Sequence, residues 1–310
     1  RARLDIALIT ADNKIAFRDQ IPLTEEEDKV DKITSTFFNI MKPKVGDKRI
    51  MGLCIIIPGI IDAENKRILS TVIGVGYSDP VVQRFEEAFH DYPFCLLNDT
   101  ACFAYAEYVF ANITEPNFAY INVSKGVGAC LFANGKMLRG AGGNATQFGH
   151  FSVDRNGPLC ACGNHGCVER VVGENALTER AEACGIDLTR FAGRKPLYCD
   201  IGAMAEDGNA HAKELIKDLA VDLSFAISNL ITLFNPSLVV IGGMGVNLGP
   251  FFLSNIRDEV QNSGFKEFVS NTWIQYSTLG LDSELGGAAR YYIDHYYDFF
   301  EQMQGGLYAD

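Results

Sequence analysis

The sequence predicts an α/β fold with a mostly parallel sheet, arranged as two similar α/β regions. Two continuous apolar runs, at residues 49–59 and 94–99, are typical of strands buried on both faces, and a helical pattern follows each of them. A second set of strands and helices begins at residue 117. This alternation favours an α/β fold, and a chain of 310 residues is long enough to form two lobes.

In the first region, residues 3–23 contain two β-branched runs on either side of Asp12-Asn13, which predicts a hairpin. Residues 24–41 are charged and periodic, and we expect a helix there. Two further helices are expected at residues 79–90 and 100–110, the second of them capped by Asp99 or Thr100.

In the second region, residues 117–140 predict three strands, joined by a glycine loop and an Asn134-Gly135 turn. A long helix is expected at residues 209–234, where Asn235-Pro236 ends it. A buried strand that enters a glycine turn and a terminal helix complete the region, at residues 237–245 and 283–299.

The composition excludes some classes of partner. The formal net charge is −12, so these residues should repel phosphate backbones and anionic membranes. No apolar run reaches the roughly 18 residues needed to span a bilayer, and no secretory signal opens the sequence. The nine cysteines are an odd number in a long chain, which is typical of free thiols. We therefore expect a cytoplasmic protein with no membrane partner.

The segment from His150 to Cys167 is rich in metal-binding residue types. His150, Cys160, Cys162 and Cys167 follow the pattern His-x9-Cys-x-Cys-x4-Cys, and three thiolates with one imidazole match a tetrahedral zinc site. The alternatives are four unrelated residues or a redox pair, but the C-x-C spacing lacks the thioredoxin C-x-x-C. With four protein ligands no position stays open for water, so we expect a structural Zn²⁺.

Residues 149–169, GHFSVDRNGPLCACGNHGCVE, resemble the signature of the ROK family, which comprises bacterial sugar kinases and sugar-responsive transcriptional repressors. The resemblance covers nearly the whole chain and implies a two-lobed actin/hexokinase-like (ribonuclease H-like) fold with an inserted zinc loop. Four further segments resemble, in order, the family's PG loop, Asn-Asp motif, sugar loop and adenosine-side strand: IIIPGIID (55–62), LLNDTACFAYAE (96–107), LRGAGGNATQFGH (138–150) and LFNPSLVVIGGMG (233–245).

On this basis we expect the N-terminal lobe at residues 1–104 and the C-terminal lobe at residues 105–287, with the zinc loop at residues 150–168. The terminal helix at residues 288–310 is expected to pack back on the first lobe.

The resemblance implies a sugar site in the cleft between the lobes, with Asp99 as catalytic base if the chain is a kinase. The metal would hold one nitrogen of His150, so that the other donates to a hydroxyl. The alternatives are a helix cap for Asp99, a turn residue at a strand end for Asn98 and a solvated carboxylate for Glu169. The expected sugar contacts are Asn98, Asp99, Gln147, His150 and Glu169.

The nucleotide-side loops depart from the pattern of the family's kinases. Those kinases carry Asp-x-Gly-Gly-Thr between their first two strands, whereas Asp5 is followed by IALIT, so that first strand and its loop are absent from these residues. A sheet without this central strand would leave two ladders unpaired. Gly242 and Gly243 form the adenosine-side turn. The second phosphate loop, usually Gly-Thr-Gly-x-Gly-Gly-Gly, reads Ser124, Lys125, Gly126, Val127, Gly128, Ala129 and Cys130.

Two further positions differ from the kinases. Thr146-Gln147 replaces the usual Gly-Glu before the Gly-His, which removes a charge but keeps an amide that can bond hydroxyls. Ile73 is aligned with the usual Asn of the Asn-Leu-x-Gly-Trp segment. Each change weakens phosphoryl transfer more than sugar binding, because backbone N–H groups exposed by glycines hold the phosphates of ATP.

The sequence therefore predicts the sugar-binding effector domain of a ROK-type transcriptional regulator. A sugar or sugar phosphate would shift the lobe angle, and a homodimer or tetramer would relay the shift to DNA through an upstream winged helix outside these residues. The first alternative is a hexose or N-acetylhexosamine kinase that uses ATP and Mg²⁺, with Asp99 as base. The second alternative is a sugar-binding or scaffold protein with neither DNA nor ATP function.

Overall fold

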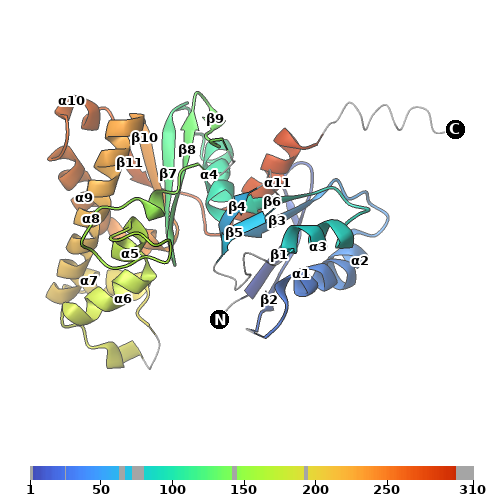
Figure 1. The fold of residues 1–310 in the computed structure, drawn as a ribbon, viewed down its shortest axis with the longest axis horizontal. Helices are drawn as coiled ribbons and strands as arrows, with labels where there is room; N and C mark the ends of the chain where they lie inside the picture. The colour runs from blue at the N-terminus through green and yellow to red at the C-terminus, as the bar shows by residue number, and fades with distance from the viewer. Residues whose placement is uncertain are drawn as a thin grey trace. The chain divides into compact units, whose positions relative to one another are not determined.

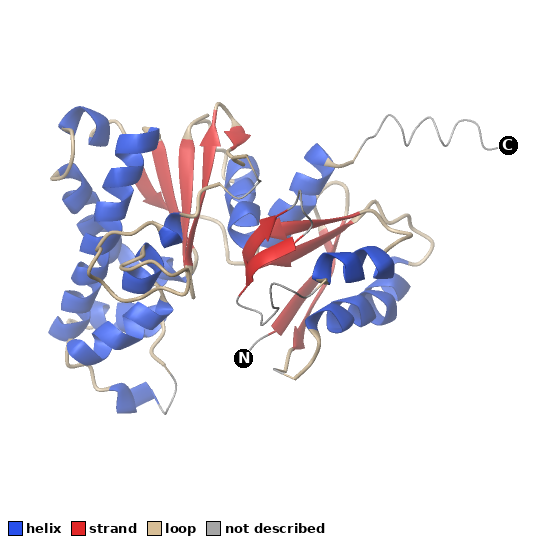
Figure 2. Ribbon diagram, viewed as in Figure 1, coloured by secondary structure: helices blue, strands red, loops and turns tan. Residues whose placement is uncertain are grey.

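The predicted α/β class is confirmed by the computed structural model of the chain (Figures 1 and 2). The residues that the structure describes are 3–24, 26–62, 67–71, 80–141, 145–191 and 195–297.

The chain folds into two compact units. Unit 1 comprises Arg1–Asn112, Ala141–Asn144 and Asp282–Asp310, and unit 2 comprises Ile113–Gly140 and Ala145–Leu281. The boundary expected at residue 104 would cut through a helix, and the structure instead keeps that helix whole within unit 1.

The strands of unit 1 lie in separate two-stranded sheets. β1 (Arg3–Ile9) and β2 (Ile15–Pro22) form the predicted antiparallel hairpin, and Asn13 in its turn has a φ of 62°, which asparagine tolerates. β3 (Leu53–Ile57) pairs in parallel with β6 (Phe94–Asn98). Within the described residues β1 pairs only with β2 and β3 only with β6.

A third pair of strands, β4 (Gly59–Asp62) and β5 (Arg67–Thr71), is antiparallel. The helix expected at residues 24–41 is instead three short segments, because a π-helical turn interrupts it. These segments and α3 enclose an aromatic core in which the ring centroids of Phe37 and Phe89 lie 5.4 Å apart. The helices around this core are α1 (Lys29–Thr36), η1 (Phe37–Met41), α2 (Lys42–Val45) and α3 (Val81–Ala88).

The chain terminus returns to unit 1 through α11 (Ser283–His295), which packs against α4 (Asp99–Phe110). The Tyr105 hydroxyl donates to Asp294 over 2.6 Å. The two helices are in close contact at Gly287, where an added Cβ would overlap the Cys102 carbonyl and lie 3.0 Å from the Ala106 Cβ.

Unit 2 is built on a mixed five-stranded sheet. Its strand order is β11-β10-β7-β8-β9, in which β7, β10 and β11 are parallel and β8 and β9 are antiparallel to their neighbours. The strands are β7 (Phe118–Val123), β8 (Val127–Ala133), β9 (Lys136–Met137), β10 (Leu238–Gly242) and β11 (Trp273–Tyr276).

The larger helices of unit 2 gather on one face of this sheet (Figure 2). The predicted long helix forms the centre of that layer, with leucines four residues apart fully buried at positions 215, 219 and 223. The helices are α5 (Val168–Val172), α6 (Glu174–Ala183), α7 (Tyr198–Glu206), α8 (Ala210–Phe234), α9 (Gly249–Gln261) and α10 (Lys266–Val269), with short 3-10 turns η2 (Phe148–His150), η3 (Leu188–Phe191) and η4 (Met244–Leu248).

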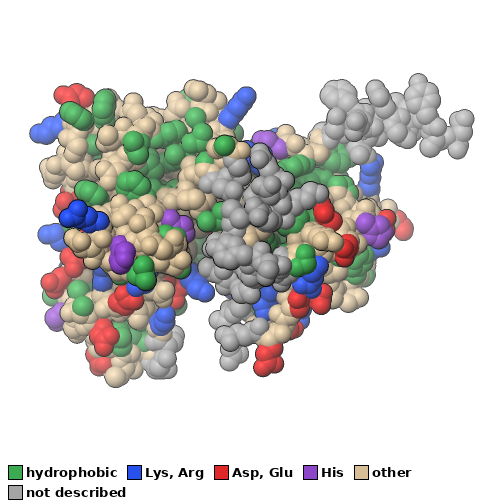
Figure 3. Space-filling view, in the orientation of Figure 1, with side chains coloured by type: hydrophobic (Ala, Val, Ile, Leu, Met, Phe, Trp, Pro, Cys, Tyr) green, Lys and Arg blue, Asp and Glu red, His purple; other side chains and the backbone are tan. Residues whose placement is uncertain are grey.

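Charged side chains of both signs are interspersed over the visible face of each unit (Figure 3). Among the described residues, the structure contains no helix with the length and apolar character needed to cross a bilayer.

The contact at Gly287 gives the first prediction. Gly287→Ala should lower the free energy of unfolding by about 1–3 kcal/mol, because the new Cβ meets the backbone of α4 rather than a flexible side chain. Urea unfolding followed by circular dichroism measures this change. Gly280→Ala is the matched control, since a Cβ at Gly280 has no neighbour within 4 Å. Equal stability of the two variants would contradict the packing of α11 on α4.

Candidate metal and sugar-binding site

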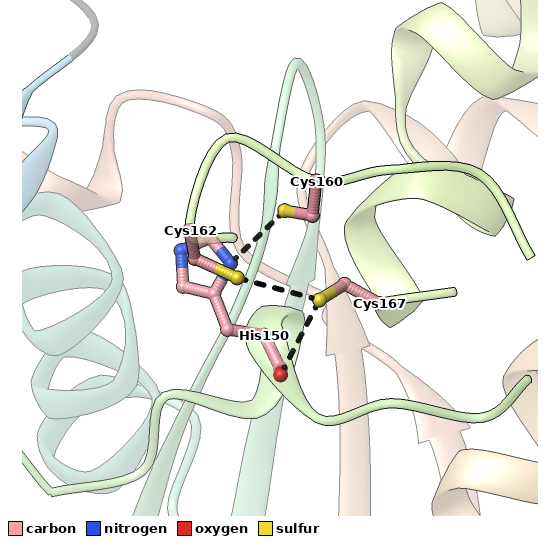
Figure 4. Close-up of side chains that lie close together, drawn as sticks. All are labelled: His150, Cys160, Cys162 and Cys167. Carbon is pink, nitrogen blue, oxygen red and sulfur yellow. Dashed lines mark hydrogen bonds between the residues drawn. The ribbon is translucent and has the colours of Figure 1, made fainter. Parts of the chain in front are cut away.

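The four residues predicted as metal ligands converge in unit 2 (Figure 4). Their ligand atoms all lie within 4.8 Å of one another. Cys160 Sγ lies 3.6 Å from His150 Nδ1, and Cys162 Sγ lies 3.6 Å from Cys167 Sγ. Bonds of about 2.3 Å to a tetrahedral Zn²⁺ would place such atoms roughly 3.5–3.8 Å apart, so the donor set and its spacing fit this ion.

The local backbone explains how the cluster closes. Two isolated β-bridges, Ser152 with Cys167 and Leu159 with His165, hold the segment as a narrow double strand. Gly166 has a φ of 58°, and a Cβ there would overlap the Asp154 carbonyl, so only glycine permits this approach.

The protonation of the thiols is set by their surroundings. Burial and the neighbouring thiols raise the pKa of Cys167 to about 12, whereas the backbone N–H of Asn164 lowers the pKa of Cys162. Cys167 and Cys160 are buried and Cys162 is exposed. A divalent cation bound here would therefore displace protons from the thiols, and its affinity should rise with pH.

The short η2 turn places His150 at the cluster. Thr146 has a φ of 67°, which is strained for a β-branched residue, and its hydroxyl donates to the Ala129 carbonyl over 2.7 Å. Gly149 passes so close to Val127 that a Cβ would overlap the Val127 carbonyl. The ring of His150 turns Nδ1 toward Cys160, which directs Nε2 to the opposite side of the imidazole.

Gln147, a predicted sugar contact, is exposed and lies at an apolar groove of about 230 Å³ between β8 and α8. Leu131, Phe148 and Leu230 also line this groove. The structure thus places Gln147 in the same short segment as His150, with its side chain among apolar neighbours.

Glu169 lies in the first turn of α5, two residues after the ligand Cys167. The Val127 N–H donates to Glu169 Oε2 over 3.3 Å. An added Cβ at Gly126 would overlap the same carboxylate oxygen. The carboxylate is therefore in contact with the turn that corresponds to the second phosphate loop.

That turn is closed by hydrogen bonds within the protein. The Ser124 N–H donates to the Gly126 carbonyl over 2.9 Å, and the Met244 N–H donates to Ser124 Oγ over 3.1 Å. Together with the bond from Val127 to Glu169, these contacts occupy backbone N–H groups that a phosphate would need. Gly243, with a φ of 77°, brings the turn that was predicted as the adenosine side against Ser124.

Asn98 and Asp99 lie in unit 1, at the carboxyl end of β6, where parallel sheets present ligand-binding residues. The helix cap predicted at Asp99 or Thr100 is wrong, because Asn98 caps α4: its Oδ1 accepts from the Ala101 N–H over 3.1 Å. Its Nδ2 donates to the Gly59 carbonyl over 2.7 Å. Asp99 instead accepts from the Thr100 N–H, and desolvation raises the pKa of Asp99.

Unit 1 also contains an acidic residue that sequence reasoning missed. Glu284, in the first turn of α11, is half-buried, and burial followed by the nearby carboxylate of Asp99 raises its pKa to about 7. The charges of Asp5 and Asp282 also raise the pKa of Glu284, whereas the charge of Arg18 lowers it.

The predicted residues are thus divided between the units. Asn98 and Asp99 belong to unit 1, whereas the four metal ligands, Gln147 and Glu169 belong to unit 2. Ile73 lies outside the described residues. Sequence reasoning did not find Tyr198, which is 2% exposed and donates from its hydroxyl to the carbonyls of Ser124 and Val172. No motif marks this tyrosine.

The family of the chain follows from its sequence. The sequence profile of the ROK family matches residues 1–294. The chain belongs to the ROK family. It is similar to the xylose repressor of Bacillus subtilis (strain 168), with 26% identity over 250 residues, which are 80% of this chain and 62% of the repressor. The chain therefore spans less than two thirds of the length of that relative.

Solved ROK structures share the fold. One is a ROK family transcriptional regulator, a homologue of the Escherichia coli MLC protein, with a TM-score of 0.81 and 24% identity over 93% of this chain and 74% of that chain. Another is a ROK glucokinase from Streptomyces griseus in complex with glucose and AMPPNP, with a TM-score of 0.76 and 22% identity over 93% of this chain and 95% of that chain. The actin/hexokinase-like fold is therefore confirmed, and it is common to regulators and kinases.

The pKa of Glu284 gives a prediction for stability against pH. A carboxyl group whose pKa is raised in the folded protein favours folding below its unfolded value near 4.5, and this contribution is lost as the pH rises through about 7. Glu284→Gln should therefore be more stable than the parent protein at pH 8, by about 1–3 kcal/mol, and no more stable at pH 5. Urea unfolding at both pH values checks this difference, and a constant difference would contradict it.

The ligand cluster gives a prediction for metal content. Cys162→Ser should reduce bound zinc from roughly one ion per chain to a small fraction of that, because a hydroxyl is a poor replacement for a thiolate. Elemental analysis of the purified protein after dialysis measures the loss. Cys199→Ser is the control, since Cys199 is an exposed free cysteine of α7 outside the cluster. Unchanged zinc in Cys162→Ser would show that the metal is held elsewhere.

Proposed function

We propose that this chain is the sugar-binding effector domain of a ROK-type transcriptional regulator. The observation that carries the proposal is the turn at residues 124–128, in which the N–H groups of Ser124 and Val127 bond to oxygens of the protein itself. The four predicted metal ligands converge in the same unit. Repressors among the curated relatives support the same conclusion. In this proposal DNA binding belongs to a winged helix outside these residues, and an oligomer of the regulator relays the signal to it.

In this proposal Zn²⁺ is held by His150 Nδ1 and by the thiolates of Cys160, Cys162 and Cys167, and its role is structural. When bound, the ion supplies a fixed anchor for the loop. Through Nδ1 the ion would hold the His150 ring in one orientation and one tautomer. In that tautomer Nε2 carries a proton that it can donate to a sugar hydroxyl.

Glu169 and Gln147 complete the sugar contacts that unit 2 supplies. A carboxylate accepts from hydroxyl groups, and an amide both donates and accepts, so together they can match the alternating polarity of a sugar ring. Asn98 and Asp99 are proposed as the contribution of unit 1. A sugar acts as an effector only if it binds one arrangement of the protein more tightly than another.

The same residues argue against phosphoryl transfer. ATP hydrolysis and transfer depend on N–H groups and cations that stabilise the charge of the phosphates. At the turn of residues 124–128 the Val127 N–H is paired with a carboxylate, which would repel a phosphate at short range.

One observation favours a kinase as the second candidate. Asp99 does not cap α4, and the raised pKa of its carboxyl group suits a general base. A ROK-type hexose or N-acetylhexosamine kinase that uses ATP and Mg²⁺ is therefore the alternative to a regulator.

A binding and turnover experiment separates the two. Calorimetry with xylose, glucose and N-acetylglucosamine should find a sugar that binds, and Cys162→Ser should weaken that binding at least tenfold, because a loose loop no longer orients His150. A coupled ADP-release assay with the same sugars, ATP and Mg²⁺ should detect no turnover. A rate above roughly 1 s⁻¹, which is ordinary for an enzyme, would establish the kinase instead.

A further inference from the structure

The position of the Glu169 carboxylate depends on residue 126 being a glycine, which has no side chain. Gly126 does not have a positive φ, so its backbone conformation is open to any residue. Its ideal Cβ would nevertheless overlap Glu169 Oε2. Apart from the chain neighbours of Gly126, the one further atom of the described residues within 4 Å is Glu169 Cδ at 3.4 Å. Glycine at this position is therefore explained by the carboxylate and not by the backbone.

The turn that receives the carboxylate is held from several directions. The Tyr198 hydroxyl donates to the Ser124 carbonyl over 3.0 Å and to the Val172 carbonyl, at the end of α5, over 3.1 Å. The Glu174 N–H donates to the Lys125 carbonyl over 3.3 Å. These contacts join the turn to α5 and α6, so Gly126 and Val127 form a fixed surface against which Glu169 rests.

We propose that the Gly126–Val127 peptide is the positioning element for Glu169: the missing Cβ admits the carboxylate, and the Val127 N–H orients it for a sugar hydroxyl. The inference deepens the proposed sugar binding and rests on it. A carboxylate has two oxygens that together accept about four hydrogen bonds. One bond to Val127 fixes the group and leaves acceptor capacity for the ligand.

The turn that departs from the phosphate-binding pattern thereby has a second role. Its N–H group orients a carboxylate that belongs to the sugar site. Gly126 and Val127 are positioning residues in this scheme, because they act on the sugar through Glu169.

The test uses Gly126→Ala, Glu169→Asp, the double variant and, as control, Gly280→Ala, whose new Cβ meets open space. Gly126→Ala should fold normally and retain its zinc, since only a flexible carboxylate has to move. Its affinity for whichever of xylose, glucose or N-acetylglucosamine binds the parent should fall roughly 10- to 100-fold. In the Glu169→Asp background the shorter side chain leaves room for a Cβ at position 126. There Gly126→Ala should lower the sugar affinity less than about threefold.

Hydrogen exchange of the Val127 amide gives a readout that needs no sugar. Glu169→Ala and Gly126→Ala should both speed this exchange by about tenfold, and Gly280→Ala should leave it unchanged. Protection of the amide in Gly126→Ala equal to that of the parent would overturn the proposal. If no sugar binds the parent, the proposed function fails while the exchange rates still decide the position of Glu169. If sugar binds and Gly126→Ala leaves its affinity unchanged, the positioning role alone is rejected.

Discussion

The convergence of one imidazole and three thiols is the constraint on which the candidate site depends. Cys167 is both a member of this cluster and the residue that precedes the first turn of α5. The direction in which α5 leaves the loop is therefore tied to the ligand geometry, and with it the position of Glu169 two residues later. His150, at the other end of the loop, is tied to the same point. A metal site with four protein ligands would thus fix His150 and Glu169, the two proposed sugar contacts, relative to each other.

The parts of the structure that the sequence predicts well are those encoded by neighbouring residues. The apolar run at residues 49–59 is typical of a parallel strand, and the structure has such a strand at residues 53–57, although only Ile55 and Ile57 are buried in it. Asn134-Gly135 is typical of a tight turn. The four residues predicted as metal ligands have a local spacing, and the structure brings them together. In contrast, the π-helical turn at Phe37–Met41 interrupts a helix whose periodicity is continuous, and nothing in the local pattern marks the change.

The contacts that were not predicted are long-range. Val127 and Glu169 are 42 residues apart, and the bond between them depends on how β8 and α5 pack in unit 2. The same is true of Tyr198, which reaches the carbonyl of Ser124 from α7. Asn98 and Asp99 are adjacent and have similar N-cap propensities, so the sequence does not distinguish them. In the structure Asn98 has the extended backbone of a cap residue, and its side chain caps α4. This matters for function, because it separates the residue that holds the helix from the residue available for chemistry.

The two carboxylates that resemble a sugar kinase's polar residues therefore have different physical roles. Asp99 lies where desolvation raises the pKa of its carboxyl group, and a carboxylate with a raised pKa is a stronger base when it is ionised. Glu169 accepts a hydrogen bond from the Val127 N–H, which holds its carboxylate against the turn. A proton acceptor alone does not transfer phosphate, since the transition state requires several donors around the γ-phosphoryl group. At the turn of residues 124–128 the Ser124 N–H donates to the Gly126 carbonyl and the Val127 N–H donates to Glu169. The Met244 N–H, from outside the turn, donates to Ser124 Oγ. Because the N–H groups of Ser124 and Val127 are already paired within unit 2, neither is available at this turn to bind a phosphate.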